Sequence, residues 1–403
     1  VNALAAVGAT GSINFLVLGF ALGLCSGFGI PVAQSFGAQD YSMMRKHVAN
    51  ALYLCLFATI FLTTITLFTT PSLLRLMQTP SDIYQDSYTY ISIMFMGIIA
   101  TIYYNMLSSI LRALGDSKTP LLFLAVASII NVILDYIFVV YFKMGVAGVA
   151  WATLIAQAIS AVLCAFFMAK HFPILKFSKE ELKLDGHCCK ELLAIGVPMG
   201  LQFSITAVGS VMIQTAINGL GSAKVAAVTA ANKIQMMFTQ PLDTLGTTMA
   251  TYCGQNLGAK KIDRIKDGLK KSFLLSFGYC LLACLIMWTL STKIALLFID
   301  ANEVAILSDV QLYLRINSVF YFVLGILFIT RNSLQGLGYS ALTMLAGLAE
   351  LIGRGVVAFL FVGSFGYAAI CAANPFAWFL ADVILITTFV VKLKELNKIV
   401  QVD

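Results

Sequence analysis

Asp135 is an acidic residue inside an apolar stretch, residues 119–141, and Asn131 precedes it by four positions. In a helix this spacing places both side chains on one face, one turn apart. An ionisable group within an apolar span is costly to keep there, and burial favours its neutral form, so such a carboxyl group is suited to gain and lose a proton. The pair therefore indicates a cation-coupling site. The structural alternative is that Asp135 only accepts a hydrogen bond that ties two helices together.

Two further pairs of polar residues share this helical spacing. Thr153 and Gln157 form a second polar face within residues 147–169, although such side chains can also simply bond across helices. Glu350 and Arg354 lie within residues 340–362, where they can neutralise each other. We interpret the second pair as structural, with a role in lining a cavity as the alternative.

Two more acids lie within apolar stretches without an obvious partner. Asp243 follows Pro241, and because a proline inside a helix implies a bend, Asp243 is a candidate for facing an internal cavity. Asp382 lies in the middle of the last apolar stretch. Both are substrate or cavity candidates by the rule that an intramembrane acid is a functional hypothesis.

The elements that position these residues are membrane-spanning helices. The 403 residues are 60% hydrophobic and 11% charged, with a mean hydropathy of +0.90, and a typical soluble domain is about 25% charged. Apolar runs long enough to cross a bilayer recur along the whole chain. The sequence therefore predicts an all-α polytopic membrane protein with eleven spans, at residues 12–36, 47–70, 89–111, 119–141, 147–169, 192–218, 226–256, 270–298, 312–335, 340–362 and 368–391.

An internal duplication organises these spans. Gln34-Ser-Phe-Gly-Ala-Gln-Asp40 returns as Gln255-Asn-Leu-Gly-Ala-Lys-Lys261, and Leu111–Ser117 returns as Leu334–Ser340, displaced by 221 and 223 positions. A fixed long period indicates repeated units. We predict an N-terminal lobe at 1–170, a cytoplasmic linker at 171–191 and a C-terminal lobe at 192–403. The span at 192–218 precedes the second copy, so its counterpart would lie before Val1. This predicts a twelve-helix architecture of two six-helix lobes, with the first helix absent from this chain.

Charge placement predicts the orientation. Loops 37–47, 112–118, 170–190, 257–271 and 331–340, together with the C-terminus, hold 19 Lys and Arg, against four on the other side. Because cytoplasmic loops are enriched in these residues, we expect a multi-pass protein of the cell membrane with a cytoplasmic C-terminus. The net charge of +7 follows from these loops, so no nucleic-acid partner is expected.

Several kinds of chemistry are excluded. The three histidines (His47, His171 and His187) all fall in predicted loops, so no His-ligated metal site is expected within the membrane. The sequence lacks a Walker A loop, an HExxH motif and a nucleophile elbow. We therefore expect no enzyme activity, no cofactor and no nucleotide-driven transport. Any transport would depend on an ion gradient or on a partner.

The chain resembles the MATE (multidrug and toxic compound extrusion) family of secondary transporters. The resemblance rests on the order and spacing of Ala33–Asp40, Arg112–Pro120, Asn131–Phe138, Gly145–Thr153, and Gly196–Pro198 followed by Gln255–Ala259. It implies twelve helices in two six-helix lobes. It also implies export of cationic, often aromatic, small molecules in exchange for protons or sodium ions.

The resemblance assigns roles to individual residues. Asn131 and Asp135 fall on family positions that line the N-terminal lobe cavity and bind the coupling ion, Thr153 matches a third such position, and Tyr90 a fourth. One branch of the family instead uses acids at positions that are Thr206 and Gly325 here. The absence of those acids predicts coupling through the first lobe, as in the DinF-like branch.

Three functions remain open at this stage. The first is an ion-coupled antiporter that exports organic cations by alternating access, embedded in the lipid bilayer as a monomer. The second is a lipid-linked oligosaccharide flippase of related architecture, which would need a strongly basic cavity. The third is a channel or receptor, which would show no gradient-driven uphill transport.

Overall fold

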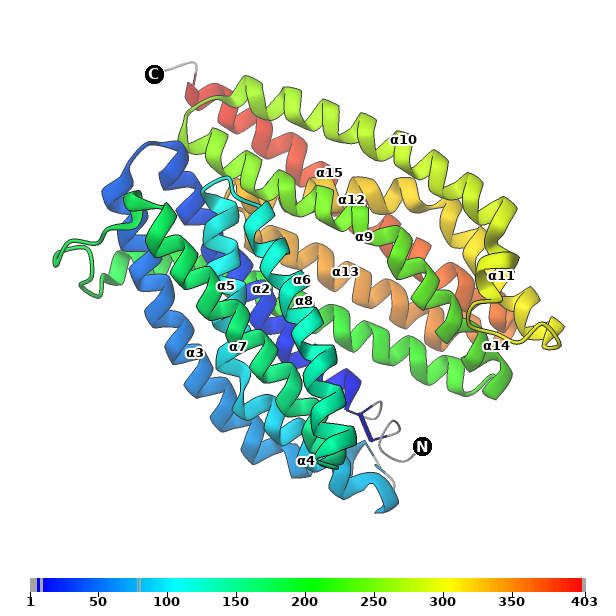
Figure 1. The fold of residues 1–403 in the computed structure, drawn as a ribbon. Helices are drawn as coiled ribbons and strands as arrows, with labels where there is room; N and C mark the ends of the chain where they lie inside the picture. The colour runs from blue at the N-terminus through cyan, green and yellow to red at the C-terminus, as the bar shows by residue number, and fades with distance from the viewer. Residues whose placement is uncertain (1–5, 8–9, 78, 80, 401–403) are drawn as a thin grey trace. The chain divides into compact units, whose positions relative to one another are not determined.

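The computed structural model describes residues 6–7, 10–77, 79 and 81–400. The described chain is helical throughout and contains no strand (Figure 1). It forms two compact units, Val1–Ser204 and Ile205–Asp403, and the boundary falls within one continuous helix, α8. The lobe boundaries expected at 170 and 192 remain a prediction.

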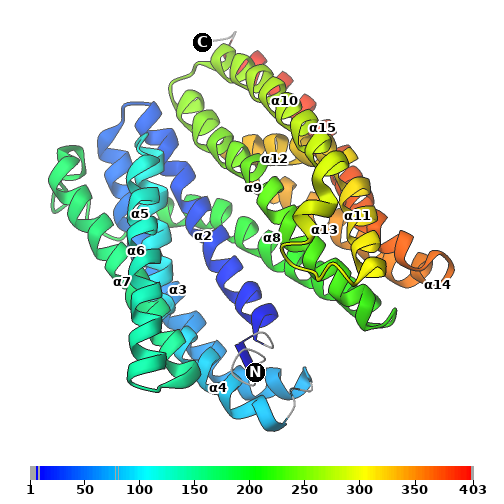
Figure 2. The same cartoon turned by 45° about the vertical axis from the view of Figure 1, so that its right-hand side comes forward.

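Unit 1 contains the helices of the first repeat. These are α2 (Gly11–Gly37), α3 (Tyr41–Leu76), α4 (Ser81–Met96), α5 (Ile98–Ala113), α6 (Lys118–Asp135), the π-helical turn η1 (Tyr136–Tyr141), α7 (Gly145–His171), the 3-10 turn η2 (Pro173–Leu175) and the first part of α8 (Gly186–Asn218). Helices α6 and α7 run side by side in both views (Figures 1 and 2).

Unit 2 continues from the second part of α8. It contains α9 (Ser222–Gly258), α10 (Ile262–Ala295), α11 (Val304–Val319), α12 (Tyr321–Gly336), α13 (Ser340–Val356), the π-helical turn η3 (Val357–Phe361), α14 (Val362–Phe365) and α15 (Tyr367–Val400). Within this unit α12 packs against α9, and α13 packs against α15.

The predicted all-α membrane architecture is confirmed, and each of the eleven predicted spans falls on described helix. In the described part of the chain, eight helices are by themselves long and apolar enough to cross a bilayer. Two more spans are bent pairs: α4 with α5, bent by 45°, and α11 with α12, bent by 51°. The remaining predicted span, 226–256, lies in α9, which is long enough but less apolar because it carries Lys233, Asp243 and many hydroxyl and amide side chains.

The duplication is visible in the backbone. The two bends centre on Gly97 and Phe320, and the two π-helical turns begin at Tyr136 and Val357, so the copies keep the displacement of 221 to 223 positions. Left-handed residues also recur in pairs: Gln39 (φ 59°) with Lys260 (φ 56°), and Gly115 (φ 93°) with Gly338 (φ 92°). The repeated Gln34–Asp40 motif is thus a helix-ending turn, and Asp40 then caps α3 by accepting from Met43 N at 2.9 Å.

Both bends leave backbone carbonyl groups that a neighbouring helix satisfies. In unit 1, Thr63 Oγ1 on α3 donates to Phe95 O at 3.1 Å. In unit 2, Cys280 Sγ on α10 donates to Tyr321 O at 3.3 Å. Because unpaired backbone groups are costly away from water, these contacts stabilise the broken spans.

Close approach of α2 and α8 in unit 1 depends on glycine. A Cβ atom added to Gly27 would lie 2.5 Å from the Cα of Gly196, and one added to Gly23 would lie 2.5 Å from the backbone oxygen of Met199. Small residues of this kind let membrane helices pack backbone to backbone. The Gly196-Val-Pro198 motif therefore has a packing role in the first part of α8.

The segment between α7 and α8 is fastened to unit 1. Glu181 is buried and binds Arg45 through two bonds, at 2.8 Å to Nε and 2.7 Å to Nη2, and also accepts from Ser42 Oγ at 2.9 Å. The Arg45 guanidinium holds the pKa of the Glu181 carboxyl well below its usual range. Tyr53 of α3 donates to Leu182 O at 2.9 Å. Glu181 of the predicted linker is therefore packed against α3 rather than exposed to solvent.

Candidate functional site

The candidate coupling residues of unit 1 lie where α6 changes into η1. Asp135 is the last residue of α6, and the π-helical turn starts at the next residue. Asn131 Nδ2 donates to Thr153 Oγ1 of α7 at 3.5 Å, and Thr153 Oγ1 donates to Val149 O at 3.0 Å. π-Helical turns inside α-helices are frequent at functional sites because they re-aim the side chains around them.

Asp135 is an acid without a fixed partner. Its side chain is half-buried, and its Oδ1 is shielded from solvent without a hydrogen-bond partner among the described residues. In the part of the chain that the structure describes, Asp135 forms no ion pair, and the amide of Asn131 donates to Thr153 instead. The phenol of Tyr90 on α4 lies within electrostatic range of the carboxyl group. An acid in this setting can change its charge without breaking an existing ion pair.

The remaining unit 1 candidates surround this position. Tyr90 is buried against Val146, Ala150 and Leu154, so it belongs to the α4–α7 core rather than to an open surface. Gln157 lies one turn beyond Thr153, and its Oε1 is buried without a partner among the described residues. The structure therefore brings Asn131 and Thr153 into contact and places Asp135 and Tyr90 near one another.

Unit 2 holds its acid differently. Glu350 of α13 is buried between two guanidinium groups: Arg331 of α12 is in direct contact with its Oε1, and Arg354 Nη2 lies 3.4 Å from its Oε2. The expected contact between Glu350 and Arg354 is present, but Arg331 is the closer partner. Glu350 therefore forms ion pairs with one arginine of its own helix and with one arginine of α12.

A chain of hydrogen bonds extends from this cluster across the unit. Arg354 Nε donates to Asn374 Oδ1 of α15 at 3.3 Å, and Asn374 Nδ2 donates to Tyr313 OH of α11 at 3.1 Å. Tyr313 OH in turn donates to Asn232 Oδ1 of α9 at 3.0 Å. The polar cluster thus connects α9, α11, α13 and α15 through hydrogen bonds between side chains.

Arg331 was missed as a site residue, and its assignment to a cytoplasmic loop at 331–340 is wrong. It is buried inside α12, which continues to Gly336. The predicted span 312–335 contains Arg331, but the count of basic residues assigned the same residue to the 331–340 loop. The buried Glu350 on the adjacent span was the available signal, since an intramembrane acid requires a cation.

Asp243 and Asp382 complete the surroundings of Arg331. Both carboxyl groups lie within electrostatic range of its guanidinium. Asp382 is buried on α15, and its Oδ1 has no hydrogen-bond partner among the residues described. Asp243 is half-buried on α9, with Gln240 Nε2 at 3.5 Å from its Oδ2. Two cations and three carboxyl groups are therefore gathered in the second unit.

A cavity of about 440 Å³ opens beside the Arg331–Glu350–Arg354 cluster. This volume lies within the range of ordinary small-molecule sites. Its lining combines polar groups with aromatic rings, the mixture that orients an amphiphilic ligand. The lining includes Thr206, Ser210, Gln214, Asn232, Gln235, Tyr313, Phe328, Arg331, Glu350, Arg354, Asn374 and Trp378.

Within the described residues, no group of three or more His, Cys, Asp or Glu side chains is arranged to hold a metal ion. The candidate sites instead contain isolated carboxyl, amide, hydroxyl and guanidinium groups in apolar helices. Such groups bind and release small cations or polar parts of a ligand. They do not form the nucleophile–base arrangement that covalent catalysis requires.

Comparison with known proteins assigns the family. The sequence profile of the MatE family matches residues 1–137 and 198–360, more than half of the chain. The chain belongs to the MatE family. It is 30% identical over 342 residues to the probable multidrug resistance protein YpnP of Bacillus subtilis, covering 84% of this chain and 75% of that protein. It is 27% identical over 310 residues to the probable multidrug resistance protein YoeA of the same organism, covering 75% and 67%.

A solved MatE-family structure has the same fold. The crystal structure of MATE in complex with MaL6 superimposes with a TM-score of 0.92 at 21% identity, covering 99% of this chain and 90% of that one. The chain is therefore a multi-pass membrane protein of a transporter family. The assignment to the DinF-like branch stays a prediction.

Proposed function

We propose that this MatE-family protein is an ion-coupled antiporter that exports organic cations, with proton or sodium as the coupling ion and Asp135 as the coupling residue. The observation that carries the proposal is the isolated Asp135 at the α6–η1 junction. An acid that is not committed to an ion pair can bind a proton or sodium ion and release it again. The names of the Bacillus relatives support multidrug efflux as the activity.

The surroundings of Asp135 supply a mechanism. The ionised carboxylate of Asp135 competes with Thr153 Oγ1 for the hydrogen-bond donor of Asn131. When a cation neutralises Asp135, nearby polar groups no longer have to stabilise a negative charge. We propose that α6 then repacks against α7. The π-helical turn η1 lowers the cost of that change because its hydrogen bonds are already irregular. Repacking of the first unit is the ion-coupled step of the proposed cycle.

The cavity of unit 2 supplies a place for the substrate. Aromatic rings of Tyr313, Phe328 and Trp378 line it, and a cation is attracted to the face of such rings. Glu350 adds a carboxylate to the cavity wall, and this carboxylate is ion-paired with Arg331 and Arg354. The carboxyl groups of Asp243 and Asp382 lie within electrostatic range of Arg331 in the same cluster. These residues bind the organic cation in the proposed cycle.

The orientation follows the distribution of basic residues. We propose that the protein lies in the cell membrane with its C-terminus in the cytoplasm, and that it exports substrate away from that side. The protein acts as a monomer in this scheme and needs no cofactor beyond the coupling ion.

A flippase for lipid-linked oligosaccharides is the second candidate, and the cluster argues against it. A pyrophosphate group requires a surplus of cations, whereas Arg331 and Arg354 both contact Glu350. Two acids lie close by as well. The cavity of unit 2 therefore has no uncompensated basic character.

Transport in proteoliposomes tests the proposal. The purified protein would be reconstituted, and export of a fluorescent organic cation would be measured with a proton gradient and a sodium gradient imposed separately. We expect one of the two gradients to drive uphill export, and Asp135→Asn to reduce it to the level of empty liposomes. Asp82→Asn, which alters an exposed acid in the first turn of α4, is the matched control and should transport normally.

Persistence of gradient-driven export in a well-folded Asp135→Asn protein would show that coupling lies elsewhere. The same assay separates the alternatives. Uptake of a lipid pyrophosphate in preference to organic cations would favour the flippase, and purely downhill flux would favour a channel.

A further inference from the structure

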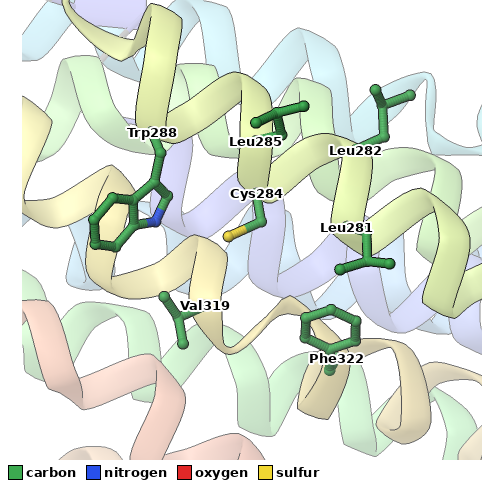
Figure 3. A pocket seen from close by; sticks show the side chains of 7 residues that line it. All are labelled: Leu281, Leu282, Cys284, Leu285, Trp288, Val319 and Phe322. Carbon is green, nitrogen blue, oxygen red and sulfur yellow. The ribbon is translucent and has the colours of Figure 1, made fainter.

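A hollow of about 590 Å³ lies on unit 2 between α10 and the break in the α11–α12 span (Figure 3). Leu281, Cys284 and Trp288 of α10 face Val319 and Phe322 across it, and Leu282 and Leu285 complete its lining. The α10 residues are spaced at i, i+3 and i+7, so they form one stripe along the helix. The hollow is therefore an apolar groove along a membrane-spanning helix.

The groove results from the bend at Phe320. Helix α10 continues without a break from Ile262 to Ala295, while the neighbouring span turns by 51° between α11 and α12. Val319 and Phe322 lie on either side of this break. Trp288 and Leu285 remain exposed beside it. Within a bilayer, lipid chains are the medium that surrounds such a surface.

A cation lies next to the groove. Arg315 of α11 places its guanidinium carbon 5.5 Å from the centre of the Trp288 ring and donates from Nη2 to Trp288 O at 3.1 Å. Arg315 precedes Val319 by one helical turn, and helical side chains tilt toward the helix start. The guanidinium thus points toward the 296–303 connection, where the span meets the membrane surface, as a snorkelling arginine does.

Among the described residues, no carboxylate is paired with this cation. Within the described chain no acidic oxygen lies within 4.0 Å of Arg315, and its Nε is shielded from solvent without a hydrogen-bond partner. Asp309 on the same helix is already committed, since both of its oxygens bind Lys224 Nζ, at 2.8 and 2.7 Å. An arginine at a lipid-facing position is costly unless an anion satisfies it.

We propose that the groove and Arg315 together form a binding site for an anionic phospholipid. Its phosphate pairs with Arg315 at the membrane surface, and one acyl chain occupies the groove between Trp288 and Phe322. Charge complementarity selects an anionic headgroup over a zwitterionic one. The apolar lining selects a lipid over free phosphate, which has no chain to fill the groove. The site is separate from Asp135 and from the cavity of unit 2.

Tryptophan fluorescence gives a local test. The chain has three tryptophans, so in a Trp151→Phe/Trp378→Phe background only Trp288 emits. The purified protein would be titrated in detergent with phosphatidylglycerol or phosphatidylcholine carrying bromine on the acyl chain, which quenches a neighbouring indole. We expect phosphatidylglycerol to quench at concentrations about fivefold lower, the preference that one basic residue near a membrane surface provides.

Substitutions separate the charge from the groove. Arg315→Gln should abolish the preference for phosphatidylglycerol, and Arg315→Lys, which keeps the charge, should retain it. Val319→Phe should fill the groove without adding a second tryptophan, and should weaken quenching by both lipids. Arg75→Gln, at the exposed last turn of α3, is the matched control and should change nothing.

Three results would overturn the proposal. One is equal quenching by the two lipids in the parent protein. Another is a retained preference in Arg315→Gln, and the third is displacement of phosphatidylglycerol by inorganic phosphate at similar concentration. None of these readouts depends on transport, so the proposed antiport and the lipid site can fail independently.

Discussion

The acids on corresponding helices of the two units have opposite surroundings. Asp135 ends a helix, α6, in which only Pro120 and Ala127 are buried, and it has no fixed ion pair. Glu350 lies on α13, the corresponding helix of the second unit, where it is buried and bound by Arg331 and Arg354. Both helices continue into a π-helical turn, which begins directly after Asp135 and seven positions after Glu350, so the two acids lie at different places on corresponding helices.

This difference separates two uses of a carboxyl group in a membrane. A carboxylate that is bound by two guanidinium groups holds helices together. A carboxyl group without a partner contributes little to packing and is available to bind an ion. The contrast therefore makes opposite predictions for stability and for transport when each acid is neutralised.

The largest expected effect on stability is at Glu350. Glu350→Gln leaves two buried arginines without their anion, and breaking a buried ion pair from one side costs about 3–5 kcal/mol. The midpoint of thermal unfolding of the purified protein in detergent would measure it. Removing Arg331 as well, in Arg331→Met/Glu350→Gln, should recover part of the loss. An unfolding curve like that of the unmodified protein would mean that the cluster is not structural.

A smaller loss is expected at Arg354. Arg354→Gln leaves Glu350 bound to Arg331 but removes a charged hydrogen bond and the donor to Asn374, which together cost about 2 kcal/mol. The same unfolding measurement applies. Arg264→Gln, at an exposed position in the first turn of α10, serves as the control. A loss at Arg354 as large as that at Glu350 would contradict the secondary role of Arg354 in the cluster.

Glu181 is an intermediate case, because its partner Arg45 is partly exposed to solvent. Glu181→Gln should cost about 1 kcal/mol after allowance for solvent screening, and should increase hydrogen exchange in residues 176–185. Glu180→Gln changes an exposed neighbour and is the matched control.

The Glu181 contribution also has a defined dependence on pH. Arg45 lowers the pKa of Glu181 in the folded protein, so the stabilisation is complete above the ordinary glutamate pKa of about 4.3 and is lost as the pH falls toward the lowered value. The difference between the parent and Glu181→Gln should therefore be constant from neutral pH to about pH 5 and shrink below about pH 4. A difference that grows on acidification would contradict this assignment.

The smallest expected effect on stability is at Asp135. Asp135→Asn breaks no ion pair, so its free energy of unfolding should lie within about 0.5 kcal/mol of that of the parent protein, while transport is lost. Measured beside Glu350→Gln, it completes the comparison. A strongly destabilised Asp135→Asn protein would indicate that Asp135 is a structural acid like Glu350.

The sequence predicts the spans and the repeat well because both depend on local patterns. Apolar runs locate the helices, and the copied Gln34–Asp40 motif sets the displacement that the left-handed residues and the bends then follow. The spacing of Glu350 and Arg354 within one helix also predicts their contact, since i and i+4 positions are neighbours.

Contacts between helices are not predictable in this way. Arg331 and Glu350 are 19 positions apart, and Arg45 and Glu181 are 136 apart, so no helical spacing joins them. The π-helical turns have no local sequence signal either, because they arise from an irregular hydrogen-bond pattern that tertiary packing maintains. The candidate site could therefore be located by its isolated acid, whereas the ion-pair cluster could not.

The paired π-helical turns also carry historical information. A π-helical turn arises when one residue is inserted into an α-helix, which disturbs the register of everything that follows. The turns at Tyr136 and Val357 occur at equivalent places in units whose sequences have otherwise diverged. The simplest history is one insertion in a single ancestral half, before the gene duplicated. The irregular turn is then older than the two-unit protein, and Asp135 and Glu350 occupy different positions on a scaffold that already contained it.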